Sequence, residues 1–392
     1  MLMLMNPKFT CKLPNKSRLA GFFVFALLTA CNQAPSQDAL IARAQTEPAV
    51  ALSLAAQRLA SGETDAALQF FQLAATAGDS TALSHALALQ QRLHGRLSAA
   101  SWLAQQWQLG LITADAVSQA QRAELGLWPQ HKPTVDAYAS AAGCQLTVQP
   151  VASQQQGVAR WHTLLQAWQQ DGQLAALPVC FNALHVINST QLRCSEQSNS
   201  RISCHYPSLQ TLVSTGEFSQ LLVVAGRGTA SYNNGILQLP DTASLALLRH
   251  EFMHVLGFID EYALADSIAT EVCQPDKIYP NLLIKADADA YQQHWQLPDA
   301  PQLTAVDTCQ AMGIQAYRVI AQDNLMRFYE LGLPAEYFAL AQQILAQPDK
   351  LMPVQYYFAY LARQQQNWPL WQQLMQQAAD QGYADASSAL AP

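Results

Sequence analysis

The spacing of the apolar residues changes twice along the chain, and these changes divide it into three parts. Between residues 36 and 127 the sequence is rich in Ala, Leu and Gln, and apolar residues recur every three or four positions. Such spacing is typical of short amphipathic helices. Glycines stand where turns between these helices are expected, at Gly62, Gly78, Gly95 and Gly110.

The middle of the chain has the composition of strands. Between about 140 and 240, clusters of Gly, Asn and Ser separate runs rich in β-branched and aromatic residues, namely CQLTVQPV, VCFNALHVI, RISCHY, QLLVVAG and GILQL. This pattern predicts strands. Helical spacing returns at Thr242, and helices resume after a loop-rich region. We therefore expect an α+β fold, with a mixed domain over 140–346 between helical segments at 38–135 and 350–392.

The first 30 residues have the layout of a secretory signal. An uncharged apolar stretch from Leu19 to Ala30 follows four basic residues, Lys8, Lys12, Lys16 and Arg18. The stretch is too short to span a bilayer stably, so it predicts a signal peptide over residues 1–30.

The end of this stretch, Leu28-Thr29-Ala30-Cys31, resembles the bacterial lipobox. The resemblance implies cleavage before Cys31, lipidation of this cysteine and a polar tether over residues 31–37. The chain would then be a lipoprotein of the bacterial cell envelope that contacts the membrane through Cys31, and Asn32 favours the outer membrane. The alternative is an ordinary signal peptide. The net charge of −7 makes nucleic acid an unexpected partner.

Six further cysteines remain after Cys11 is cleaved away and Cys31 is lipidated. An even number in an oxidising compartment predicts up to three disulfides, in any of fifteen pairings. We favour Cys194 with Cys204 across a short polar hairpin, and Cys273 with Cys309 around a loop. The six cysteines lie in the middle of the chain, at Cys144, Cys180, Cys194, Cys204, Cys273 and Cys309.

The stretch HEFMHVLGFIDEY, residues 250–262, concentrates charge in a chain that is only 12% charged. We expect it on a helix that begins with Asp241 as its N-cap. His250 and His254 are four residues apart and therefore share one helix face, next to Glu251. This HExxH spacing places two imidazoles for a zinc ion beside a carboxylate that can act as general base.

The extended motif HExxHxxGxxD resembles the signature of the metzincin metallopeptidases, in which the helix stops at the glycine. Its positions are filled by His250, Glu251, His254, Gly257 and Asp260. The resemblance implies a catalytic domain with a mixed sheet and an active-site helix. It also implies a Zn²⁺ ion bound by His250, His254 and Asp260, with Glu251 as the general base of peptide-bond hydrolysis.

The residues that follow the motif leave the third ligand open. Glu261-Tyr262 resembles the DEY ending of the IgA-peptidase-like branch of metallopeptidases, where the spacing can be one residue longer. Asp260 is therefore the first choice and Glu261 the second. A gluzincin arrangement with Glu271 is a third possibility. Tyr262 would either donate a hydrogen bond to the oxyanion or pack in the core.

Two further features belong to the metzincin resemblance. The family has a methionine-containing turn beneath the metal, for which Met326 in Asp323–Arg327 competes with Met312. The family also binds extended peptides along an edge strand. We expect this edge in QLLVVAG and the following loop GRGTASYNNG.

The two ends of the chain share a short pattern. Ala74-Ala75-x-x-Gly78-x-x-x-Ala82 matches Ala378-Ala379-x-x-Gly382-x-x-x-Ala386. Both resemble tetratricopeptide repeats of the Sel-like subclass, which implies a protein partner on the helices. Two functions remain: a lipid-anchored zinc endopeptidase that acts on a peptide or protein substrate, or a non-catalytic, lipid-anchored scaffold that binds a protein partner in the periplasm.

Overall fold

The computed structural model describes residues 36–129 and 131–391. The expected signal peptide at 1–30, Cys31 and most of the tether lie outside the described residues. Within the described part, no helix combines the length and the apolar character needed to cross a membrane.

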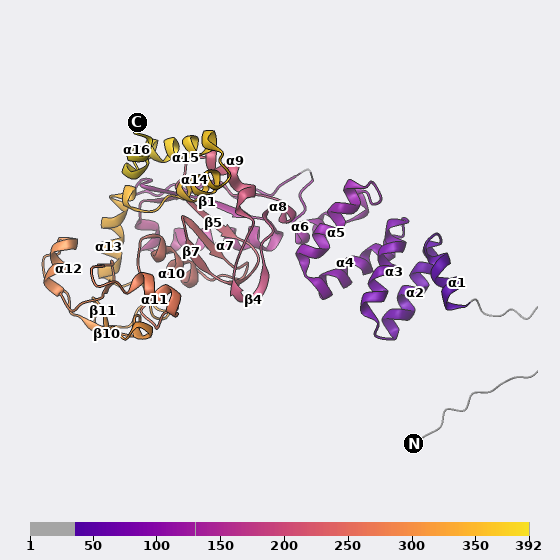
Figure 1. Ribbon diagram of the computed structural model, residues 1–392, viewed down its shortest axis with the longest axis horizontal. Coiled ribbons are helices and arrows are strands. Elements are labelled where there is room, and N and C mark those ends of the chain that lie inside the picture. Colours follow the sequence, from indigo (N-terminus) through magenta and orange to yellow (C-terminus); the bar gives the residue numbers. More distant parts are fainter. Residues whose placement is uncertain (1–35, 130, 392) are drawn as a thin grey trace, which may run out of the picture.

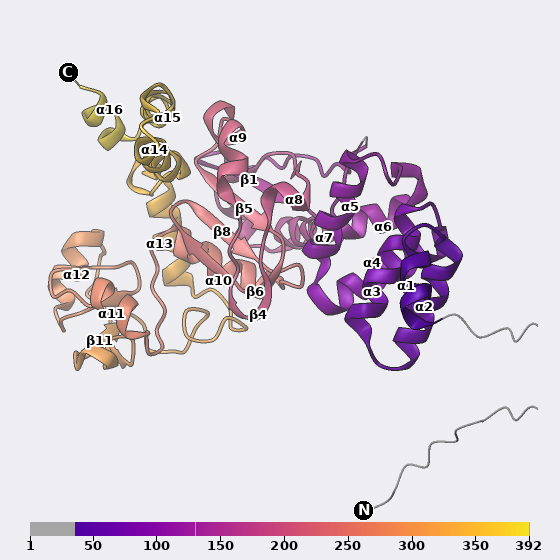
Figure 2. The ribbon, with the colours of Figure 1, turned by 45° about the vertical axis from the view of Figure 1, so that its right-hand side comes forward.

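The N-terminal helices form an arm beside the rest of the molecule (Figures 1 and 2). The expected turn glycines all adopt positive φ angles, as helix ends commonly require. The helices share a core of their own, built of Ala and Leu side chains together with Phe70 and Phe71. The arm comprises α1 (Gln37–Ala44), α2 (Pro48–Ala60), α3 (Thr64–Thr76), α4 (Ser80–His94), α5 (Arg96–Gln108), the 3₁₀ turn Ala114–Ala116 and α6 (Gln119–Leu125).

A mixed sheet lies at the centre of the molecule, in the order β2-β1-β5-β8-β7, and β3 also pairs with β1. All pairings are parallel except that of β7 with β8. The mixed α/β character agrees with the expected α+β class. The strands are β1 (Leu146–Ala152), β2 (Val179–Phe181), β3 (His185–Val186), β5 (Gln220–Val224), β7 (Ser231–Asn233) and β8 (Ile236–Leu239).

Two strand expectations need correction. QLLVVAG forms β5, which is central in the sheet, and the antiparallel edge is β7 from the GRGTASYNNG loop. RISCHY contributes only Arg201 to a strand, because β4 (Glu196–Arg201) lies mostly before it and pairs with β6 (Arg227–Thr229). β4 consists of polar residues, so the search for β-branched and aromatic runs does not identify it as a strand.

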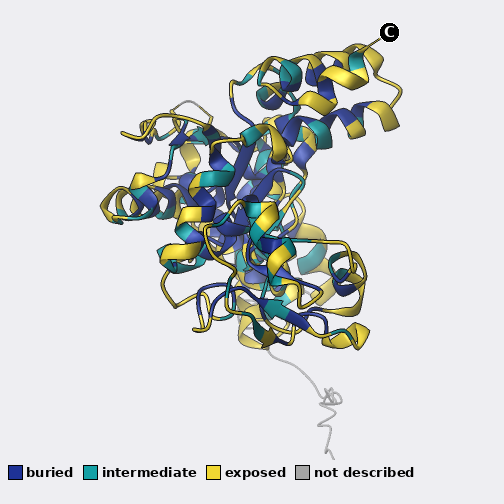
Figure 3. Cartoon of the chain, turned by 90° about the vertical axis from the view of Figure 1, so that its left-hand side faces the viewer, coloured by how far each residue is buried: buried dark blue, intermediate teal, exposed yellow. Residues whose placement is uncertain are grey.

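Alternating side chains of the sheet enter two cores. Leu222 and Val224 pack with α7 (Gln155–Gln170) and the motif helix α10 (Leu245–Val255). Leu221 and Val223 pack with the C-terminal helices on the opposite face. Figure 3 shows these strands as the buried centre of the molecule. The opposite face is covered by α9 (Gln210–Thr215), α14 (Val354–Gln364), α15 (Trp368–Asp380) and α16 (Ala384–Leu390), with α8 (Ser189–Leu192) and the 3₁₀ turn Tyr206–Leu209 nearby.

The repeated Ala-Ala-x-x-Gly pattern forms the same turn at both ends of the chain. The amide of Gly78 bonds to the carbonyl of Ala75, and that of Gly382 bonds to the carbonyl of Ala379. The next amide in each turn reaches the preceding alanine, Ala74 or Ala378. The shared letters therefore encode a shared helix ending.

A smaller region follows the motif helix and holds the antiparallel sheet β10-β11-β9. The six cysteines of the described part form three disulfides, and the predicted pairs Cys194–Cys204 and Cys273–Cys309 are confirmed. The third pair is Cys144–Cys180. The elements of this region are α11 (Asp266–Val272), β9 (Leu282–Leu283), α12 (Ala288–Trp295), β10 (Thr304–Val306), the 3₁₀ turn Gln310–Met312 and β11 (Ala316–Arg318), followed by α13 (Ala335–Leu345) and the 3₁₀ turn Pro348–Lys350.

Candidate metal centre

Helix α10 presents the motif from the core of the molecule. It begins at Leu245, where the Ser244 hydroxyl accepts the amide of Leu247 at 3.1 Å. The expected N-cap Asp241 is wrong, because its buried carboxylate instead accepts a hydrogen bond from Arg96 of the arm. Phe252 is buried on the core face of the helix. The polar motif residues can therefore project from a rigid element.

The helix ends as the glycine predicts. Gly257 has φ +82°, and its amide donates to the carbonyl of His254 at 3.0 Å. The amide of Phe258 donates to the carbonyl of Met253 at 3.1 Å, which completes a Schellman ending. Met253 and Phe258 are buried in the same core. This ending turns the chain back towards the helix and brings Asp260 to the histidines.

Three donor atoms meet at the end of this turn. His250 Nε2 lies 3.3 Å from His254 Nε2, and Asp260 Oδ1 lies 3.4 Å and 3.3 Å from these two atoms respectively. A tetrahedral zinc ion with ligand bonds of about 2.0–2.1 Å separates its ligands by about 3.3–3.4 Å. The three donors therefore have the spacing of one face of a zinc tetrahedron, and together they form a candidate metal-binding group.

The two imidazoles are oriented for metal binding. His250 Nδ1 lies 2.9 Å from the carbonyl oxygen of Leu325, and His254 Nδ1 lies 2.8 Å from that of Phe258. A carbonyl oxygen can only accept, so each Nδ1 carries a proton, and the Nε2 of each imidazole in its neutral form has a lone pair for a metal. Asp260 Oδ1 is buried and accepts no hydrogen bond within the described part. Lone pairs facing one another at this distance fit a bound cation.

The electrostatics also favour positive charge between the three donors. Burial opposes a charge on His254, but Asp260 and Glu251 favour it and raise the pKa of His254 to about 9. Burial likewise opposes the charge on Asp260, yet the two imidazoles lower the pKa of its carboxyl. Burial and the neighbouring His254 lower the pKa of His250. These residues therefore fit a divalent cation.

Glu251 lies next to the ligands and has the properties of a proton acceptor. Its side chain is buried, and this burial raises its pKa to about 7, although His254 and Arg201 act in the opposite direction. Arg201 is exposed at the end of β4. A carboxylate that titrates near neutrality can both take up and release a proton at physiological pH.

Glu261, the second choice for the third ligand, lies behind the site. The residue is fully buried and its Oε1 accepts hydrogen bonds from Tyr337 at 2.7 Å and Asn281 at 3.1 Å. Its Oε2 accepts from Asn324 at 2.8 Å. The donors already occupy both oxygens, so the expectation that Glu261 could bind the metal is wrong.

The Glu261 cluster instead supports the first histidine. Asn324, which donates to Glu261, also accepts the amide of Met326 through its Oδ1 at 2.8 Å. The amide of Glu261 in turn donates to the carbonyl of Met326 at 2.9 Å. These bonds hold the turn that presents the Leu325 carbonyl to His250. The resemblance had singled out the stretch Asp323–Arg327, but it indicated neither the roles of Asn324 and Leu325 within it nor Asn281, because these roles depend on contacts between distant segments.

The remaining candidates are separated by their exposure. Met326 is fully buried in the turn beside His250, whereas Met312 is 42% exposed, so Met312 does not lie beneath the site. Glu271 is exposed on α11 and lies outside the donor group. Tyr262 is 45% exposed, so the core-packing alternative is wrong for this residue.

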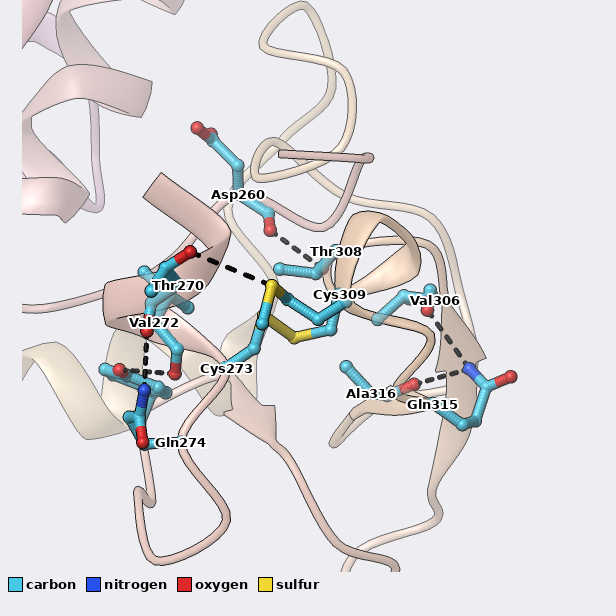
Figure 4. The surroundings of a disulfide bond; sticks show 12 residues. Asp260, Thr270, Val272, Cys273, Gln274, Val306, Thr308, Cys309, Gln315 and Ala316 are labelled. Atoms are coloured by element: carbon cyan, nitrogen blue, oxygen red, sulfur yellow. Dashed lines mark hydrogen bonds between the residues drawn. A yellow bond between two sulfur atoms is a disulfide. The ribbon is translucent and has the colours of Figure 1, made fainter. Parts of the chain in front are cut away.

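A disulfide stands behind the third ligand. Thr308 donates its hydroxyl proton to the main-chain carbonyl of Asp260 at 2.9 Å. Thr308 is adjacent to Cys309, which is bonded to Cys273 at the end of α11. Figure 4 shows this link, with the Asp260 carboxylate pointing away from the disulfide. The disulfide therefore limits the movement of the segment that carries Asp260.

A cavity of about 520 Å³ lies beside His254. Tyr232 of the edge strand β7 lines it together with Pro280 and Trp295. Lys350 is also in its wall. The edge strand and the histidine thus border one space.

No family model matches this chain, and no curated protein or solved structure resembles it significantly. The chemistry of the site is therefore inferred from the identity and geometry of its residues, and not from a related protein.

Proposed function

We propose that the protein is a zinc-dependent endopeptidase of metzincin type. The observation that carries this proposal is the triangle of His250, His254 and Asp260 donor atoms, 3.3–3.4 Å apart, beside the buried Glu251. Two imidazoles and one carboxylate are a common donor set for catalytic zinc, and three protein ligands leave the fourth position open. This donor set favours zinc over magnesium or calcium, which prefer oxygen ligands.

The residues of the site divide the work of hydrolysis. A zinc ion bound there would supply Lewis acidity and lower the pKa of water to near neutrality. Glu251 accepts the proton of the attacking water and then delivers it to the leaving amine. Its pKa of about 7, raised by burial, suits both transfers. The Leu325 and Phe258 carbonyls keep the imidazoles in the tautomer that the ligand role requires.

The surroundings of the site suit an extended peptide. The edge strand β7 has one neighbour in the sheet, β8, so its other side can pair with a peptide main chain. Tyr232 of this strand and His254 line the same cavity, so the edge strand lies close to one end of the donor group. These features support cleavage within a peptide chain, with the envelope and Cys31 as the proposed setting and anchor.

The scaffold function is the competing proposal, and the similar helix ends at Gly78 and Gly382 favour it. A scaffold uses its helices to bind a protein and needs no proton acceptor at the metal site. One experiment separates the two functions. The purified protein is analysed for zinc and then assayed on a mixture of quenched fluorescent peptides.

We expect about one zinc ion per chain and a hydrolysis rate that a chelator abolishes and added zinc restores. The Glu251→Gln variant, prepared in parallel, reveals any contaminating peptidase. A zinc-loaded protein that cleaves no peptide, or a variant as active as the parent, would overturn the endopeptidase proposal.

A further inference from the structure

Arg96 connects the helical arm to the part of the chain that holds the metal centre. It is the first residue of α5 and follows Gly95, whose φ of +86° turns the chain into the helix. The Arg96 side chain is only 10% exposed. A guanidinium in such a position needs partners for its charge, and both of its carboxylate partners lie outside the arm.

The two partners come from separate segments. Arg96 Nε donates to Glu196 Oε1 at 2.9 Å, and its main-chain amide donates to Glu196 Oε2 at 3.2 Å. Arg96 Nη2 donates to Asp241 Oδ2 at 2.9 Å. Within the described residues, no other cation lies within 4.0 Å of either carboxylate.

Both partner segments lead to the catalytic residues. Asp241 lies between β8 and α10, three residues before the N-cap Ser244. Its carbonyl also accepts a hydrogen bond from Arg160 of α7 at 3.2 Å. Glu196 opens β4, inside the loop closed by Cys194–Cys204, and the same strand ends at Arg201. One side chain of the arm therefore holds both the entry to the motif helix and the first residue of β4.

The burial of Asp241 makes this contact hard to replace. Asp241 is 1% exposed, and its Oδ1 has no hydrogen-bond partner in the described part. Without Arg96, the buried carboxylate of Asp241 would have no cationic partner, whereas Glu196 is partly exposed and keeps the Gln154 amide at 3.3 Å. Removing one partner of a buried ion pair is strongly unfavourable for this reason. The segment before α10 would have to move so that Asp241 could reach water.

We propose that Arg96 is a positioning residue for hydrolysis, through which the helical arm fixes the start of α10 and thereby the placement of Glu251. This inference rests on the proposed endopeptidase function. If Arg96 has this role, hydrolysis depends on the helical arm as well as on the domain that holds the metal centre.

The test compares Arg96→Met with Arg96→Lys in the full chain. We expect Arg96→Met to lower kcat by about tenfold or more, because small misplacements of catalytic groups are costly. KM should stay within about twofold and the zinc content should be unchanged, because Arg96 belongs neither to the donor group nor to the lining of the cavity beside His254. Amide hydrogen exchange in residues 242–252 should become faster. Arg96→Lys should restore part of kcat, because an ammonium can pair with one carboxylate at a time.

Arg58→Met is the matched control, because Arg58 pairs with Glu63 inside the arm at 2.7 Å. It should leave kcat and exchange unchanged. An Arg96→Met protein that is less heat-stable but keeps its kcat and the exchange protection of α10 would overturn the proposal.

Two further measurements make the outcome unambiguous. If Arg96→Met does not fold, the triple variant Arg96→Met, Glu196→Gln, Asp241→Asn removes both carboxylate charges and is measured instead, with the same expected loss of kcat. If the parent protein hydrolyses no peptide, the endopeptidase proposal fails, and the exchange rates of residues 242–252 still decide whether Arg96 positions the helix.

Discussion

Glu261 Oε2 accepts a hydrogen bond from Asn324 Nδ2 at 2.8 Å, and this contact joins the segment after the motif helix to the turn that orients His250. Glu261 directly follows the candidate ligand Asp260 in the chain, yet its carboxylate bonds to the segment that orients His250. Two consecutive residues thus have different roles, Asp260 as a candidate ligand and Glu261 as a support for His250. The function of the cluster is to fix the Leu325 carbonyl.

We expect Glu261→Gln to weaken zinc binding by about tenfold or more without removing a ligand. The amide would place a donor opposite Asn324, so one buried hydrogen bond is lost and stability should fall by about 2 kcal/mol. Zinc titration and denaturant unfolding measure the two effects. Glu336→Gln, an exposed change on the neighbouring α13, should alter neither. Unchanged zinc affinity in Glu261→Gln would contradict the supporting role.

The ligand set itself predicts a larger effect. Asp260→Ala should reduce zinc affinity by about 100-fold or more, because it removes a donor where Glu261 changes only its support. Equilibrium dialysis against buffered zinc measures the affinity. Asp307→Ala, an exposed carboxylate change in the same region, is the control. If Asp260→Ala bound zinc as tightly as the parent, the third ligand would have to be sought elsewhere.

Glu251→Gln should separate metal binding from hydrolysis. The side chain is no member of the donor triangle, so zinc content should remain that of the parent. Loss of the proton acceptor should lower kcat by about 10²–10⁴-fold. Steady-state hydrolysis and metal analysis of the same preparation test this. Zinc loss together with activity would instead assign Glu251 a structural role in the site.

The disulfides allow a matched comparison. Cys144–Cys180 and Cys273–Cys309 each span 36 residues, so the chain-entropy contribution to stability is the same, about 4 kcal/mol for each. Replacing either pair with serines should lower the free energy of unfolding by a similar amount. Only the Cys273/Cys309 double variant should also weaken zinc binding, since Thr308 next to Cys309 holds the Asp260 carbonyl. Equal zinc affinities would show that this link is unimportant.

Gly257→Ala tests the helix ending. A methyl group there would meet only Pro280 Cγ at 4.0 Å, so the cost comes from the φ of +82° and amounts to about 1–2 kcal/mol. We expect weaker zinc binding as well, because Asp260 depends on this turn. Gly78→Ala imposes a similar strain in the arm, at φ +98° with open space around it. It should be destabilising but leave zinc affinity unchanged, and equal zinc affinities in the two variants would refute the coupling.

Features encoded by neighbouring residues were predictable from the sequence. The glycine turns, the Schellman ending at Gly257 and the short Cys194–Cys204 bridge depend on a few consecutive positions. The prediction of Asp241 as the N-cap is wrong, because its carboxylate is bound by Arg96, 145 residues away in the chain, and Ser244 caps the helix instead.

The edge strand lies only in the loop half of the expected stretch, and Glu261 is not a donor of the candidate site, both for a similar physical reason. Strand order depends on which segments pair, and the apolar letters of β5 are those of a strand covered on both faces. Glu261 is bound by donors from three later segments, at Asn281, Asn324 and Tyr337. No spacing rule within the motif contains that information.

The bridge between Cys273 and Cys309 can form only in an oxidising environment, so the brace on the Asp260 segment depends on where the chain resides. While the thiols are reduced, the chain would still display both imidazoles, but the backbone of Asp260 would lack its covalent brace. The proposed hydrolase would lack this brace during synthesis in a reducing cytoplasm, and we expect it to bind zinc more weakly there. We expect full zinc affinity only after the chain has reached an oxidising environment, where the proteins of the cytoplasm are not exposed to it.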